Sequence, residues 1–198
     1  MAGTGAASGG RYRGVAPAAS LAIGKVLDDS GNGTAESVIA GMLWAATEVK
    51  AKVVNLSLGS EPADGTDPLS EAVDTLSREH GTLFVAAAGN AGEDENVASP
   101  AAADEALAVG SVNRDEVPSG FSNRGPRLGD SMVKPELVAP GEGIAAARPT
   151  DVPPLGEPVD AAYQRLDGTS MATPHVTGSA ALVAQQHPSW TGRSSSLP

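Results

Sequence analysis

The chain has 198 residues, no cysteine and a formal net charge of −11. This length favours a single domain with a sizeable core, and the lack of cysteine excludes disulfides and cysteine-ligated metal sites. The negative charge argues against nucleic acid or an anionic membrane as a partner, and no apolar run approaches the roughly 20 residues that span a bilayer.

The first ten residues are small and glycine-rich, which predicts a flexible arm over 1–10. They show neither the basic start nor the apolar stretch of a signal peptide, so none is expected. The folded domain is expected over 11–191, and it begins with a predicted buried strand over 20–27. The serine run in the tail predicts disorder over 192–198.

Apolar strands and amphipathic helices then alternate, which predicts an α/β fold with a parallel sheet. The first helix is expected from about Thr34, its N-cap, to Lys50. Its buried face would comprise Val38, Ile39, Met42, Leu43, Ala45 and Val49. The second helix should open at Asp67-Pro68 and stop at Gly81. Further strands are predicted over 53–58, 82–88 and 106–112, short extended pieces and loops over 113–167, and a last helix over about 170–186.

Gly168-Thr-Ser170-Met-Ala-Thr-Pro174-His175 places one serine at the start of the last predicted helix. A serine hydroxyl is a weak nucleophile until a base takes its proton. Taken alone, the pattern is more typical of an N-cap serine.

Two other segments end neighbouring predicted strands, where ligand sites of α/β sheets collect. Asn90 follows Ala86-Ala-Ala-Gly89, and its amide could donate to a developing oxyanion, although a turn asparagine is an equal alternative. Asn55-Leu-Ser57-Leu58-Gly59 could pair with an extended peptide through its backbone, although an ordinary strand end would look the same.

These three segments occur in one order, with Phe121-Ser-Asn-Arg-Gly-Pro126 and Lys134-Pro-Glu-Leu-Val-Ala-Pro140-Gly141 between them. Together they resemble the subtilases, the subtilisin-like serine peptidases, over about residues 5–191. The resemblance implies a subtilisin-like three-layer α/β fold with a mostly parallel sheet, and a polypeptide substrate. It also implies a cis peptide bond at Ser99-Pro100.

The resemblance assigns roles by position. Ser170 matches the nucleophile and Asn90 the oxyanion-hole residue. The strand that binds substrate would comprise Ser57, Leu58 and Gly59, and the wall of the specificity pocket would comprise Ala88 and Gly89.

The chain departs from the family where the other catalytic residues should lie. The aspartate strand and the histidine segment that precede this material in subtilases are not found among the 198 residues. The chain is therefore expected to be a partial peptidase domain, truncated at the N-terminus and shortened at the C-terminus. None of His80, His175 and His187 is expected to reach Ser170. By resemblance, the missing strand would lie between 20–27 and 53–58, so those two strands should expose edges.

The expected function is that of a subtilisin-like serine endopeptidase by family, inactive as this chain alone. Two alternatives stay open: a non-catalytic peptide-binding module, and one half of a split peptidase completed by a chain that carries the aspartate and histidine. No cofactor or metal site is expected; the family suggests calcium, but Asp28-Asp29 and Glu93-Asp-Glu95 lack the spacing of a loop motif. The family is usually secreted, while the sequence leaves the localisation of this chain open.

Overall fold

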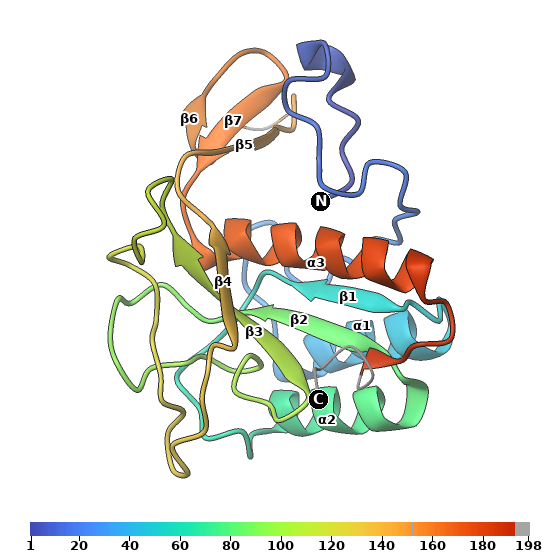
Figure 1. Ribbon diagram of the computed structural model, residues 1–198, viewed down its shortest axis with the longest axis vertical. Helices are drawn as coiled ribbons and strands as arrows, with labels where there is room; N and C mark the ends of the chain where they lie inside the picture. The colour runs from blue at the N-terminus through green and yellow to red at the C-terminus, as the bar shows by residue number, and fades with distance from the viewer. Residues whose placement is uncertain (152, 193–198) are drawn as a thin grey trace.

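A computed structural model describes residues 1–151 and 153–192 (Figure 1). Its helices and strands are η1 Ala6–Ser8, α1 Ala35–Thr47, β1 Val53–Leu56, α2 Pro68–His80, β2 Leu83–Ala87, β3 Ala106–Val112, β4 Leu137–Pro140, β5 Ile144–Ala147, β6 Glu157–Pro158, β7 Tyr163–Leu166 and α3 Thr169–Gln186. Over the described residues, β1-β2-β3-β4 form a parallel sheet in that order, and β5-β7-β6 form a small antiparallel one. The predicted α/β fold with a parallel sheet is confirmed.

The parallel sheet lies between two helical layers, with α3 on one face and α1 and α2 on the other (Figure 1). Phe84 and Ala86 of β2 pack in one apolar cluster with α1 and α2, while Leu83 and Val85 pack in a second cluster with Ala172 of α3. Every residue of β2 is buried. Strands covered on both faces are apolar throughout, which explains why their sequences show runs instead of alternation.

Both α1 and α2 begin at caps that the sequence indicates. Thr34 and Ser37 form a reciprocal capping box at the start of α1, and the Asp67 carboxylate accepts from the N–H groups of Leu69 and Ser70 at the start of α2. The buried face predicted for α1 is wrong at two positions. Leu43 is 49% exposed, and Val49, which lies beyond the end of α1, is 36% exposed.

The prediction of a buried strand over 20–27 is wrong. The segment is extended but belongs to no strand, and Leu21 and Ile23 are 54% and 78% exposed. A strand needs a neighbour to pair with its backbone groups, and the described residues supply none here. Only the end of the segment is packed, where Val26 contacts the cluster around α1 and α2.

The N-terminal residues, expected as a flexible arm over 1–10, contain the short helix η1 and fold back on the chain. The N–H groups of Gly14 and Ala16 donate to the carbonyls of Gly3 and Met1 at 2.8 and 3.0 Å. At the other end, the Gly192 N–H donates to the Gly81 carbonyl, while the rest of the predicted disordered tail lies outside the described residues. No described helix has the length and apolar character needed to cross a membrane.

Candidate active site

Ser170 lies in the first turn of α3 and is hydrogen-bonded to Ser57, the residue that follows β1. Its hydroxyl donates to the Ser57 carbonyl at 3.2 Å, and the Ser57 hydroxyl donates to the Ser170 carbonyl at 2.8 Å. Both residues are half-buried. Two segments that are 113 positions apart in the chain therefore meet at the carboxyl edge of the sheet, where the sequence analysis placed the segment that contains Ser57.

Asn90 follows β2 and reaches the same helix start. Its side-chain carbonyl oxygen accepts from the Thr169 N–H at 2.8 Å and from the Thr169 hydroxyl at 2.9 Å. Thr169 itself is fully buried, which fixes this contact. With Oδ1 engaged, the Nδ2 amino group is the end of the exposed Asn90 side chain that remains to donate. Thr169 thus brings the two predicted chemical groups, Ser170 and Asn90, to one place.

The remaining predicted site residues flank this centre. Ala88 is fully buried, and Gly89 has a φ of +109° in the region that favours glycine. A Cβ on Gly89 would overlap the Asn123 side chain. Leu58 is half-buried, whereas Gly59 is exposed and packs closely: a Cβ there would lie 3.2 Å from the Ser99 carbonyl oxygen.

Asn123 is a residue of the site that the sequence analysis did not single out. Its side chain, in a residue only 4% exposed, accepts from the N–H groups of Ala91 and Gly92 at 2.7 and 3.1 Å and donates to the Asn96 carbonyl at 2.6 Å. It therefore holds the loop that follows Asn90. The sequence did point to this residue, because Asn123 lies inside the segment 121–126 on which the family resemblance rests.

Each of the three histidines has a local contact away from the serine hydroxyl. His175 Nδ1 lies 2.9 Å from the Met171 carbonyl, the His187 ring stacks on Trp190, and His80 Nε2 lies 3.9 Å from a Glu79 oxygen. Across residues 1–151 and 153–192, no histidine or carboxylate hydrogen-bonds to Ser170 Oγ.

The acidic segments considered for calcium make local contacts. The Asp28 carboxylate accepts from the N–H groups of Asn32 and Ser30, and these bonds lower the pKa of Asp28. Asp94 pairs with Arg124 at 2.6 Å. The part of the chain that the structure describes contains no group of three histidine or acidic side chains placed to hold a metal ion.

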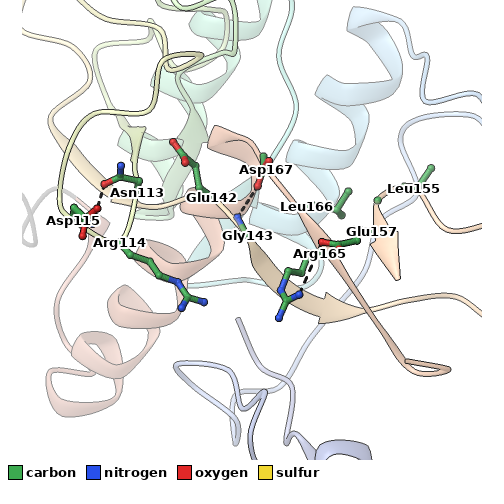
Figure 2. A pocket seen from close by; sticks show the side chains of 11 residues that line it. Asn113, Arg114, Asp115, Glu142, Gly143, Leu155, Glu157, Arg165, Leu166 and Asp167 are labelled. Carbon is green, nitrogen blue, oxygen red and sulfur yellow. Dashed lines mark hydrogen bonds and ion pairs between the residues drawn. The ribbon is translucent and has the colours of Figure 1, made fainter. Parts of the chain in front are cut away.

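A polar hollow of about 770 Å³ opens at the carboxyl ends of β3 and β4 (Figure 2). Acidic and basic side chains line it together, among them Arg114, Glu142 and Arg165. Asp167 forms part of its wall, where the carboxylate accepts from the Gly143 N–H at 2.6 Å. The charged residues that line the hollow are four acidic ones, Asp115, Glu142, Glu157 and Asp167, and two basic ones, Arg114 and Arg165, so the lining is negative on balance.

The chain is similar in sequence to known proteins over most of its length. The model of the subtilase family matches residues 1–196. Subtilisin Savinase from Lederbergia lenta is 39% identical over 178 residues, which cover 90% of this chain and 58% of that protein. Serine protease AprX from Bacillus subtilis (strain 168) is 34% identical over 213 residues, covering 96% of this chain and 48% of that protein. The chain thus spans about half the length of these relatives.

Solved structures agree as well. A cold-adapted subtilisin-like serine proteinase superposes with a TM-score of 0.70 at 36% identity, covering 86% of this chain and 55% of that one. The patellamide maturation protease PatA gives a TM-score of 0.64 at 34% identity over 83% of this chain and 56% of that one. The predicted subtilisin-like fold is confirmed, as is the Ser99–Pro100 cis peptide. The chain belongs to the subtilase family of serine peptidases.

Proposed function

We propose that this chain carries the nucleophile-bearing portion of a serine endopeptidase, and that residues 1–198 alone hydrolyse peptides at a rate near background. Ser170 is the nucleophile and Asn90 the oxyanion donor in this proposal. The observation that carries it is the pair of contacts around Thr169 and Ser57, which place the Ser170 hydroxyl and the Asn90 amide at one helix start.

The chemistry follows from these two groups. Ser170 Oγ would attack the carbonyl carbon of the scissile peptide bond, and its proton must pass to a base as the new bond forms. The carbonyl oxygen then becomes an oxyanion, to which Asn90 Nδ2 would donate a hydrogen bond. In subtilisin itself, removal of such an asparagine lowers turnover about 10²–10³-fold.

The described residues place no general base at the Ser170 hydroxyl. Among the described residues, the recorded partner of Ser170 Oγ is the Ser57 carbonyl, which cannot take a proton at neutral pH. In subtilisin, removal of the serine or the histidine lowers turnover about 10⁶-fold, so a chain without a base would hydrolyse peptides at a rate near background. We infer that an imidazole held by polypeptide outside these 198 residues would complete the site, which is the split or truncated peptidase of the sequence analysis.

Labelling of the serine tests this proposal. A fluorophosphonate probe should label residues 1–198 slowly, and a separately produced segment of a subtilase relative that carries its aspartate and histidine should raise the rate at least about tenfold. Ser170→Ala should abolish the signal. Ser179→Ala, an exposed serine of the same helix, should leave it unchanged. Fast labelling of the chain alone that disappears in Ser170→Ala would contradict the need for an outside base.

The role of Asn90 has its own variant. Asn90→Asp keeps an oxygen to accept from Thr169 but removes the N–H donor, so it should slow labelling of the completed protein by about 10²-fold with little change in folding. Labelling that is equally fast in this variant would remove Asn90 from the mechanism. If the completing segment binds and labelling does not rise, the peptide-binding module becomes the better reading.

A further inference from the structure

The polar hollow at the carboxyl ends of β3 and β4 has the size of a ligand site. Its volume of about 770 Å³ lies within the range of about 300–1,000 Å³ that is usual for such sites. Its walls come from the turn after β3, the turn after β4, and the residues in and around β6 and β7. No lining residue is one to which the family resemblance assigns a role. The hollow is therefore separate from the residues that the resemblance assigns to peptide hydrolysis.

Three charged side chains that line the hollow have no partner among the described residues. No hydrogen bond or ion pair joins the side chain of Arg114, Asp115 or Glu142 to another residue of 1–151 or 153–192. Arg165 and Glu157 are only loosely paired, since Nη1 and Oε2 lie 4.0 Å apart. The hollow thus presents both carboxylates and guanidinium groups that an occupant can satisfy.

Two leucines give the hollow an apolar side. Leu155 is 81% exposed and Leu166 is half-buried. Figure 2 shows these leucines on one side of the view, with Asp115 and Glu142 on the other. A lysine side chain has the same division, because an aliphatic stem carries a charged end. The negative balance of the lining favours a cation at the polar end.

The two arginines distinguish a polypeptide from a free amine. The side chains of Arg114 and Arg165 extend in the same direction in Figure 2, and a guanidinium group has hydrogen-bond donors only. A protonated polyamine also has donors only, so it would leave both arginines without an acceptor. A polypeptide that carries a lysine supplies the cation and also backbone carbonyl oxygens, which accept from arginine. The lining as a whole therefore fits a polypeptide.

We propose that the hollow binds an exposed, lysine-bearing segment of another polypeptide. The aliphatic stem of the lysine packs on Leu155 and Leu166, and its ammonium group pairs with Asp115 and Glu142. The arginines that line the hollow donate to backbone carbonyls of the segment. Ion pairs at an exposed site are weak and are screened by salt, so binding is tightest at low ionic strength. The proposal does not rest on the peptidase chemistry of Ser170.

Peptide binding tests the proposal directly. The probe is a fluorescein-labelled glycine-serine peptide that carries two lysines, and fluorescence anisotropy at low salt should show saturable binding to residues 1–198. The same peptide with both lysines acetylated keeps the stems but loses the charges, so it should bind at least about fivefold more weakly. Unlabelled spermidine should compete at least about tenfold more weakly than the unlabelled peptide, because it brings no acceptor. The assay needs no turnover, so a failure here is distinct from a failure of serine labelling.

Variants of exposed or half-buried lining residues locate the binding. Glu142→Gln and Asp115→Asn should each weaken it about two- to fivefold, and the double variant about tenfold. Leu155→Ser should weaken it as well, because the lysine stem loses an apolar contact. The matched control is Glu79→Gln, which makes the same change of charge at an exposed position of α2 outside the hollow and should bind like the parent.

Four outcomes of the binding assay would overturn the proposal: absence of saturable binding, equal binding of the acetylated peptide, equal competition by spermidine, or an equal loss in Glu79→Gln. The last of these would show that the peptide follows the net charge of the chain and not the hollow. Self-association in sedimentation that disappears in the double variant would overturn the proposal as well, since the occupant would then be a second copy of this chain.

Discussion

Replacement of Asn123 by alanine should destabilise the protein and loosen the loop that follows Asn90. The substitution removes three hydrogen bonds at once: two from the N–H groups of Ala91 and Gly92, and one to the Asn96 carbonyl. A hydrogen bond of this kind contributes about 0.5–1.5 kcal/mol net. The three together predict a loss of about 2–4 kcal/mol in the free energy of unfolding, a large share of the roughly 5–15 kcal/mol typical of a domain.

Urea denaturation followed by circular dichroism measures this loss. The matched control is Asn32→Ala, an exposed asparagine in the turn before α1, which should change stability by less than about 0.5 kcal/mol. In the completed protein, Asn123→Ala should also slow fluorophosphonate labelling, because Gly89 and the loop beyond Asn90 lose their support. A change in stability no larger than that of the control would refute the positioning role of Asn123.

Two further variants test the packing around the site and the cap of α2. Gly89→Ala should lower the free energy of unfolding, measured by urea titration, by about 1–3 kcal/mol more than Gly31→Ala does. Both variants impose a positive φ on alanine, but only the first places a Cβ against the Asn123 side chain. Equal losses would show that the Asn123 side chain moves aside at little cost. For Asp67, burial raises the pKa of the carboxyl, but hydrogen bonds from Ser70, Ser99 and the first backbone N–H groups of α2 outweigh it and leave that pKa below its ordinary value. A lowered pKa in the folded state means that the stabilisation is present above about pH 4 and is lost as the pH falls below it. Asp67→Asn keeps the cap, so the stability advantage of the parent over this variant should shrink between pH 6 and pH 3; an advantage independent of pH would contradict the assignment.

Some of the molecule is determined by short-range chemistry and could therefore be predicted from the sequence. The bounds of α2 follow from the Asp67 cap and from Gly81, which adopts a φ of +68°. The strand predicted over 106–112 is β3, residue for residue. Asn90 could be placed at the carboxyl edge of the sheet because it follows a predicted parallel strand, whereas Ser170 was matched to the same site only by the family resemblance.

Other features depend on contacts between distant segments, which local pattern does not encode. Residues 20–27 have the composition of a buried strand, yet a strand forms only where a second backbone satisfies its hydrogen bonds, and no strand among the described residues pairs with them. In the sequence, Asn123 is one polar residue of a predicted loop. In the structure, its side chain hydrogen-bonds to three backbone groups, those of Ala91, Gly92 and Asn96. The sequence alone determined where α1 and α2 begin and which residues form β3, because caps and apolar runs act over a few residues. Only the tertiary structure decided that β1 pairs with β2 alone among the described strands and that Asn123 holds the loop after Asn90. Both outcomes depend on contacts between segments that are far apart in the chain.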